Sequence, residues 1–167
     1  PTLRAVSLSL PRGALVAVVG GTGEGKSSLL AALLGDLPAV QAELRPRMRG
    51  SVAYCAQASW VFPGTVRENI LFGKPFDAAR YAAALWAADL GTDVQQMGGD
   101  DAELGERGVN VSGGQKQRIS LARAHYADAD IYVLDDVLSA LDAAVAAKIF
   151  KRFLLRDLRG KGEAKDI

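Results

Sequence analysis

Residues 20–27, with the sequence GGTGEGKS, constrain what this chain can fold into more than any other segment. They fit the pattern G-x-x-x-x-G-K-[ST], in which glycine backbone conformations turn amide N–H groups toward phosphate oxygens. The valine-rich run 14–19 predicts a buried strand before this loop, and apolar residues at helical spacing from Lys26 to Leu34 predict a helix after it. A helix N-terminus attracts anions, so the segment predicts a phosphate-binding site.

Two side chains of this loop have distinct predicted roles. Lys26 is expected to neutralise the β and γ phosphates, and the Ser27 hydroxyl is expected to ligate Mg²⁺. The alternative is a glycine-rich turn before an ordinary helix. The candidate nucleotide-binding residues here are Gly20, Gly21, Thr22, Gly23, Glu24, Gly25, Lys26, Ser27 and Ser28.

A second candidate element follows the apolar strand predicted over 131–134. Asp135 and Asp136 end that strand, and a phosphate loop needs a carboxylate to hold its metal ion. Asp135 is the expected metal-holding residue, and Asp136 stands where a general base would orient water. Aspartate is one methylene shorter than glutamate, so its reach toward water is poorer. The alternative is a strand that ends in a capped turn.

The remaining patterns predict alternating strands and helices. Further strands are expected at 6–10 and 51–56, whereas 91–108 is loop-like. Predicted helices, two of them capped by Asp77 and Ser112, cover 65–72, 78–88, 112–126 and 143–155. This order indicates an α/β fold with a largely parallel core sheet.

Composition excludes several classes of protein. The 167 residues carry 20 Lys and Arg against 19 Asp and Glu, which leaves no bulk charge for binding nucleic acid or an anionic membrane. A single cysteine excludes an internal disulfide framework. Every long apolar stretch is interrupted well short of the ~20 residues of a membrane span, so no direct membrane insertion by this segment is expected.

Residues 111–115, VSGGQ, and the following helix 116–124 resemble the signature of ABC nucleotide-binding domains, with valine in the first place. Small residues there let a helix N-terminus approach a phosphate closely. A plain serine-capped helix is the alternative for an isolated motif of this kind. The resemblance implies that Ser112, Gly113, Gly114 and Gln115 bind the nucleotide held by a second nucleotide-binding domain.

Other segments extend the resemblance. Gln57 stands at the position of the family's Q-loop glutamine, which implies a contact with the metal and the attacking water. Residues 139–142, SALD, are similar to the D-loop, which crosses to the partner domain. The segment from Trp60 to Phe72 resembles the region that docks on transmembrane domains, although core packing is the alternative for both aromatic residues.

Within the family, the chain is similar to the first nucleotide-binding domain of C-subfamily transporters, and the similarity lies in residues 50–54, 65–73 and 105–110. This subfamily comprises the multidrug-resistance-associated, or glutathione-conjugate, exporters. The resemblance implies ATP and Mg²⁺ as cofactors and a P-loop NTPase, RecA-like core. It also implies a small antiparallel β subdomain and an inserted α-helical subdomain. The expected division is core and β subdomain at 1–72 and 129–167, and helical subdomain at about 73–128.

The chain also departs from the family pattern. Only 19 residues precede Gly20, too few for the adenine-stacking aromatic, and no histidine follows the second acidic element. A domain that is incomplete at both ends is therefore expected. His125, the single histidine, is expected at the surface or between domains, and the basic tail 148–167 is expected to be a solvated helix face.

The expected function is ATP binding and hydrolysis for an ABC-type exporter, on the cytosolic face of a plasma or vacuolar membrane. A regulatory nucleotide clamp, weakened by Asp136, and an inactive truncated product remain alternatives. A soluble ABC protein of repair or translation is disfavoured, because the 55 residues from Gln57 to Ser112 contain no heptad run. The isolated chain is expected to bind ATP weakly without appreciable turnover.

Overall fold

The computed structural model describes residues 3, 6–37, 47–105 and 111–158. Its helices are α1 (Lys26–Leu34), α2 (Val66–Leu71), α3 (Ala78–Ala87), α4 (Gly91–Met97), α5 (Gly113–Ala127), α6 (Ala143–Ile149) and the π-helix η1 (Phe150–Leu158). Its strands are β1 (Val52–Cys55), β2 (Gly64–Thr65), β3 (Glu103–Leu104) and β4 (Ile131–Leu134).

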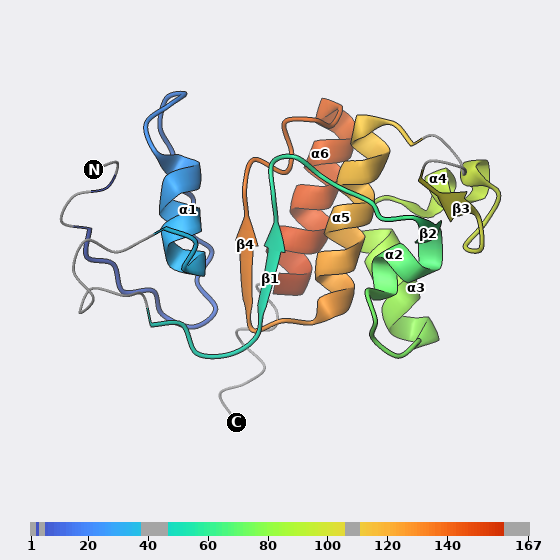
Figure 1. The fold of residues 1–167 in the computed structure, drawn as a ribbon, viewed down its shortest axis with the longest axis horizontal. Helices are drawn as coiled ribbons and strands as arrows, with labels where there is room; N and C mark the ends of the chain where they lie inside the picture. Colours follow the sequence, from blue (N-terminus) through green and yellow to red (C-terminus); the bar gives the residue numbers. More distant parts are fainter. Residues whose placement is uncertain (1–2, 4–5, 38–46, 106–110, 159–167) are drawn as a thin grey trace.

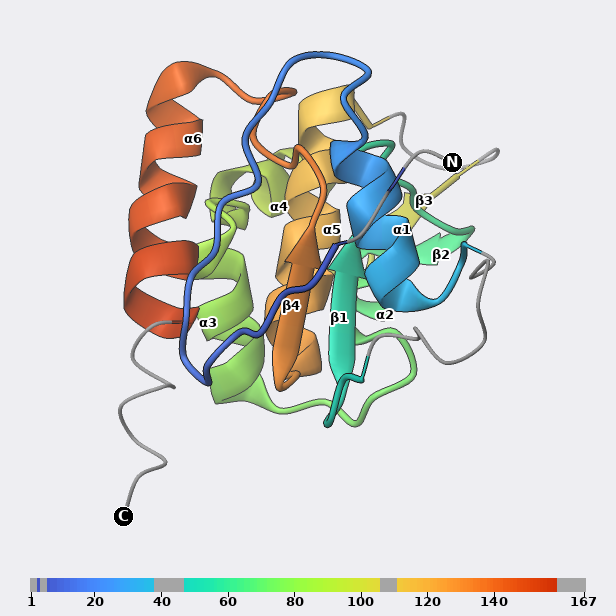
Figure 2. The same cartoon turned by 90° about the vertical axis from the view of Figure 1, so that its left-hand side faces the viewer.

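The centre of the fold is a parallel pair, in which β1 and β4 align Val52 with Ile131 and Cys55 with Leu134. Helix α1 lies on one face of this pair and α5 lies on the other (Figures 1 and 2). Parallel strands with helices on both faces define the α/β class, so the predicted class and the parallel pairing are confirmed. The predicted strand 51–56 is confirmed over Val52–Cys55.

The main hydrophobic core lies on the far side of the pair from α1, where α5 packs against α2 and α3. Its side chains are apolar and almost fully shielded from solvent, and they include Val66, Ile70, Ala84, Ile119, Leu121 and Tyr126. Each large aliphatic side chain in this layer contributes about 1.5–3 kcal/mol through burial. A short antiparallel pair, β2 with β3, closes the edge of this layer.

Two helix starts have the predicted caps, Asp77 and Ser112, and a third is capped by Thr65, where only a helix was predicted. The Thr65 side chain forms a reciprocal capping box with Glu68 at the start of α2, and Asp77 accepts from the Arg80 N–H at the start of α3. Ser112 forms the same box with Gln115 at the start of α5. The predicted helix 143–155 is observed as α6 continuing into η1.

The strands predicted at 6–10 and 14–19 are wrong. Residues 6–20 form no strand, and the side chain of Val19 is 89% exposed. The other large apolar side chains of this segment, Val6, Leu8, Leu10, Leu15, Val16 and Val18, are also exposed. An apolar run favours burial, but a strand also requires a backbone partner, and in the described part of the chain the sheet at this place contains β1 and β4 alone.

The loop predicted over 91–108 is also wrong in part, because 91–97 form α4 and 103–104 form β3. Helix α4 begins after Leu90 without a side-chain cap, so the capping signal found at α2, α3 and α5 is missing. Residues 106–110, which contributed to the resemblance, and the tail 159–167 lie outside the described residues.

His125 is not at the surface. It is 8% exposed, and its ring packs edge-on against Phe153 of η1 at 5.3 Å between centroids. This position on α5 lies on the helix face that meets η1, so the imidazole takes part in core packing. No helix among the described residues is both long and apolar enough to span a bilayer.

Candidate nucleotide-binding site

The glycine loop 20–25 leads directly into α1. Gly23 and Gly25 have φ angles of 81° and 90°, the left-handed region that side chains disfavour, which explains glycine at both positions. The Lys26 ammonium donates hydrogen bonds to the carbonyls of Gly20 at 2.9 Å and Gly21 at 2.7 Å. The predicted helix 26–34 is confirmed, and its positive end points at the loop.

The loop already holds one anion, the carboxylate of Glu24. Its Oε2 accepts a hydrogen bond from the Gly21 N–H at 2.6 Å. A Cβ on Gly20 would lie 2.6 Å from the same oxygen, so a larger residue at this position would require the Glu24 side chain to shift. The contact demonstrates that this backbone binds oxygen anions, and a phosphate oxygen that reaches the Gly21 N–H must displace Glu24.

The first turn of α1 meets the acidic end of β4. Ser27 Oγ donates to Asp135 Oδ1 at 3.1 Å, and the Asp135 N–H donates to the Cys55 carbonyl at 2.9 Å. Asp135 is only 8% exposed, so its carboxylate is fixed rather than freely solvated. A serine hydroxyl beside a buried carboxylate at the edge of a phosphate cradle is the donor set expected for Mg²⁺.

Gln57 and Asp136 lie beside this pair. Gln57 Nε2 donates to Asp136 Oδ2 at 3.0 Å, and Asp136 has a φ of 50°. The two residues follow β1 and β4, and the carboxyl ends of parallel strands meet at one edge of a sheet. The parallel pairing therefore brings together side chains 79 positions apart in the sequence.

The residues fit a magnesium nucleotide better than a protein-held metal ion. The described residues contain no group of three or more His, Cys, Asp or Glu side chains able to hold a metal ion. Mg²⁺ is ordinarily bound by one or two carboxylates together with substrate phosphates and water, and Ser27 with Asp135 provides that partial set. The exposed Thr22 lies within the glycine loop, and the half-buried Ser28 lies in the first turn of α1.

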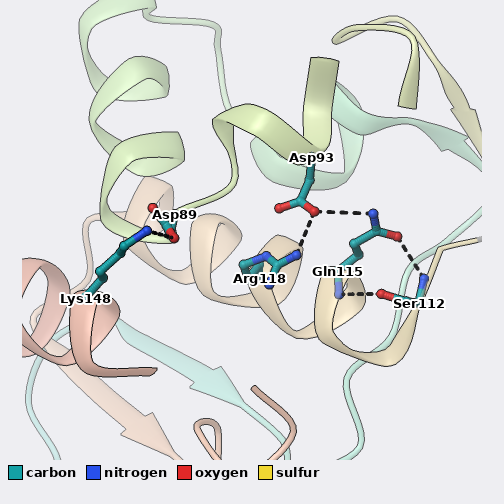
Figure 3. A network of polar contacts seen from close by, with 6 residues as sticks. All are labelled: Asp89, Asp93, Ser112, Gln115, Arg118 and Lys148. Atoms are coloured by element: carbon teal, nitrogen blue, oxygen red, sulfur yellow. Dashed lines mark hydrogen bonds and ion pairs between the residues drawn. The ribbon is translucent and has the colours of Figure 1, made fainter. Parts of the chain in front are cut away.

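The segment that resembles the signature, residues 111–115, lies at the N-terminus of α5. Ser112 N–H donates to Gln115 Oε1 at 2.9 Å, while Ser112 Oγ accepts from Gln115 N–H at 3.2 Å. Figure 3 shows that the Gln115 amide and Arg118 both reach Asp93 of α4. A polar groove of about 440 Å³ lies between this helix start and the 139–142 segment, lined by Gly114, Arg118 and Asp142 among others.

Trp60, Phe62 and Phe72 form an aromatic surface. Trp60 and Phe72 are 46% and 58% exposed, and their rings meet edge-on at 5.6 Å between centroids. The Arg123 guanidinium lies 3.9 Å from the Trp60 ring centroid, a cation–π contact. Core packing is therefore not the reason for these two aromatic side chains.

Polar side chains hold the aromatic surface from beneath. Arg123 Nε donates to the Asn69 carbonyl at 2.7 Å, and Asn69 Nδ2 donates to the carbonyls of Phe62 and Thr65 at 3.0 Å. Burial lowers the pKa of Arg123 to about 10, and the group stays cationic at neutral pH.

Sequence patterns did not identify Asp93, Asn69 or Arg123 as site residues. Each is a buried polar residue, and burial depends on contacts between segments far apart in the chain. Arg123 lies inside the 116–124 helix that carried the resemblance, but nothing in that string shows that its side chain lies beneath Trp60.

Comparison with known proteins agrees with this geometry. The sequence profile described as ABC transporter matches residues 3–139. ABC transporter C family member 13 of Arabidopsis thaliana is 51% identical over 161 residues, which is 96% of this chain and 11% of that protein. Human ATP-binding cassette sub-family C member 3 is 52% identical over 151 residues, which is 90% of this chain and 10% of that protein.

The chain thus spans about a tenth of the length of these curated relatives. The profile, by contrast, covers most of the chain, from before the glycine loop to Ser139 after β4. This coverage includes the glycine loop, the residues that follow β1 and β4, and the start of α5. The chain therefore belongs to the ABC transporter family, whose ATPase domains bind ATP together with Mg²⁺.

Proposed function

We propose that this chain is the ATP-binding and hydrolysing domain of an ABC-type membrane exporter of the C subfamily. The observation that carries the proposal is the meeting of the glycine loop with both acidic residues and Gln57 at one edge of the β1–β4 pair. Closure with a second nucleotide-binding domain would drive transport.

The loop 20–27 binds the phosphates. Its amide groups and the N-terminus of α1 supply hydrogen-bond donors, and Lys26 supplies a positive charge that the loop carbonyls hold in place. When bound, Mg²⁺ neutralises phosphate charge, and Ser27 with Asp135 would hold it. Thr22 and Ser28 complete the predicted nucleotide contacts.

Asp136 and Gln57 are the proposed water-orienting residues. The contact of Gln57 Nε2 with Asp136 Oδ2 fixes the carboxylate at the end of β4, which supports a role for both residues close to the reacting phosphate. The short aspartate side chain also supports the second candidate function, a regulatory clamp that holds ATP with little hydrolysis.

Ser112, Gly113, Gly114 and Gln115 are proposed to act on the nucleotide of the second domain. The contacts of the Gln115 and Arg118 side chains run to Asp93 on α4, and the groove beside them is bordered by the D-loop segment 139–142. Donors at a helix start, pointing at charge that develops on a phosphate, stabilise its transfer.

The proposed subdomains are a core with a β subdomain at 1–72 and 129–167, and a helical subdomain at about 73–128 that carries the signature. The aromatic surface is the proposed docking site for transmembrane domains, on the cytosolic face of a plasma or vacuolar membrane. Exposed aromatic rings held by a buried arginine support a protein interface.

The two candidate functions differ in one measurement, ATP turnover of the assembled transporter. Asp136→Glu lengthens the carboxylate by one methylene, and a large rise in turnover supports the clamp. Unchanged turnover contradicts the clamp, and loss of turnover in Asp136→Asn then identifies Asp136 as a hydrolytic residue. Lys26→Ala should remove ATP binding in either case, which tests the phosphate loop itself.

Docking has its own test. Trp60→Ala should lower substrate transport while ATP turnover continues, because it alters the aromatic surface and leaves the nucleotide site intact. Trp86→Ala is the control, since Trp86 is a similarly exposed indole, at 41%, on α3, and its ring does not belong to the aromatic surface. Equal transport by both variants would contradict the proposed docking surface.

A further inference from the structure

We propose that Asp93 is a positioning residue for the signature, and that it fixes the orientation of Gln115 at the start of α5. The inference rests on the proposed function of the signature, because it assigns Asp93 a role in arranging the donors of Ser112 and Gly113. Asp93 itself contacts neither the phosphate loop nor the end of β4 through any hydrogen bond or ion pair observed in the described residues.

Asp93 is a buried acid that receives two donors from α5. It lies in the first turn of α4 and is 8% exposed. Its Oδ1 accepts from Arg118 Nη2 at 2.6 Å and from Gln115 Nε2 at 3.3 Å, as Figure 3 shows. One oxygen atom therefore links α4 to two successive turns of the signature helix.

The carboxylate determines which end of the Gln115 amide faces the signature. An amide side chain has a donor end and an acceptor end of nearly equal shape, whereas an ionised carboxylate only accepts. Asp93 therefore selects the orientation in which Nε2 points to α4 and Oε1 points to the Ser112 N–H, 2.9 Å away. The reverse orientation would place two donors against each other at Ser112.

This orientation maintains the helix start in a form that can bind an anion. With the Ser112 N–H satisfied by Gln115 Oε1 and the Gln115 N–H satisfied by Ser112 Oγ, the capping box is complete. The Ser112 hydroxyl hydrogen then remains available, as do the first helical N–H groups, which have no intrahelical acceptor. These donors are the ones that the proposed function assigns to the partner's nucleotide.

Arg118 prevents the acid from opposing that binding. A lone carboxylate close to this helix start would repel phosphate, but the ion pair at 2.6 Å compensates its charge. The side chains of Arg118 and Asp93 are 14% and 12% exposed, so solvent screens the pair only weakly. Asp93 therefore orients Gln115 without adding a net negative charge to the groove.

The test compares two variants of similar side-chain size in the assembled transporter. Asp93→Asn keeps an acceptor oxygen, and Asp93→Leu removes it, while both lose the negative charge. We expect Asp93→Leu to lower kcat for ATP about tenfold and to raise hydrogen exchange at the Ser112 N–H by a similar factor. Asp93→Asn should retain most of the kcat and most of the protection of the Ser112 N–H from exchange. KM for ATP should stay unchanged in both variants.

A purely structural role predicts a different pattern. Both variants lose the ion pair with Arg118, so turnover would then fall in parallel with the melting temperature in both. Equal kcat values for Asp93→Asn and Asp93→Leu would overturn the positioning role of Asp93. Asp101→Asn and Asp101→Leu serve as the control pair, because the Asp101 side chain is 81% exposed.

Ser112→Ala separates this inference from the proposed function on which it depends. If Ser112→Ala leaves turnover intact, the proposed role of the signature fails. If Ser112→Ala abolishes turnover while Asp93→Leu and Asp93→Asn behave alike, the signature role stands and the Asp93 inference is wrong.

Discussion

Ser27 Oγ donates a hydrogen bond to Asp135 Oδ1 over 3.1 Å, although 108 positions separate the two residues in the sequence. The contact joins the first turn of α1 to the end of β4. It is the direct link between the phosphate loop and the acidic element, and it places a hydroxyl and a carboxylate where a magnesium ion would need both.

Replacing Ser27 by alanine should therefore weaken ATP binding chiefly when Mg²⁺ is present. Removing one proposed metal ligand leaves the phosphate cradle of Gly20–Gly25 unchanged, so affinity without Mg²⁺ should be nearly that of the unmodified chain. Calorimetric titration of ATP with Mg²⁺ and with EDTA measures the difference. Ser9→Ala, at an exposed serine, is the control, and equal loss in both buffers would contradict the assigned role.

Neutralising Glu24 should tighten ATP binding. Its carboxylate occupies the Gly21 N–H at 2.6 Å, and the charge repels phosphate. Glu24→Gln removes the like charge and replaces a charge-assisted hydrogen bond by a weaker neutral one. We expect about a three- to tenfold lower Kd, corresponding to roughly 1 kcal/mol of a charge-assisted bond or like-charge contact. Glu103→Gln, at an exposed glutamate of β3, should leave Kd unchanged, and weaker binding by Glu24→Gln would contradict this reading.

Removing the hydroxyl of Tyr126 should lower the free energy of unfolding. Tyr126 is fully buried, and its Oη accepts from the Asp77 N–H at 2.9 Å and donates to the Pro75 carbonyl. Tyr126→Phe leaves both backbone groups without this partner, at a cost of roughly 1–3 kcal/mol. Urea denaturation measures the change.

Tyr54→Phe provides the comparison for that measurement, because the Tyr54 side chain is 46% exposed on β1. A surface substitution of this kind is expected to change stability by no more than about 0.5 kcal/mol. Equal losses in the two variants would show that the buried hydroxyl contributes nothing specific.

Cys55 should resist alkylation in the folded chain. Burial is the main cause that raises the pKa of its thiol from 9.0 to about 11, so the reactive thiolate is about a hundredfold scarcer at pH 8. Iodoacetamide labelling in buffer and in urea measures the contrast. Rapid labelling of folded protein would contradict the burial of this strand.

The same shift predicts how stability depends on pH. The unfolded thiol ionises near pH 9 and the folded thiol near pH 11, so the folded state binds more protons between these values. The contribution of Cys55 is therefore complete below pH 9 and is lost as pH rises toward 11. Unfolding curves of the Cys55→Ala variant should lack this part of the alkaline decline.

Local chemistry made several elements predictable from the sequence alone. The glycine pattern at 20–25 identified the loop and the start of α1, because each position restricts backbone geometry. Asp77 and Ser112 identified two further helix starts through side-chain capping. The acidic pair after β4 was recognisable because an apolar strand precedes it.

The tertiary structure alone decided which of the apolar segments acquired partners. Residues 131–134 paired with β1, whereas the similar run 14–19 stayed exposed, since hydrophobicity favours burial without specifying a partner strand. Helix α4 had no cap to reveal it, and Asp93 gained its contacts only when α4 packed beside α5. Sequence fixes local backbone conformation, while contacts between distant residues depend on the packing of whole elements.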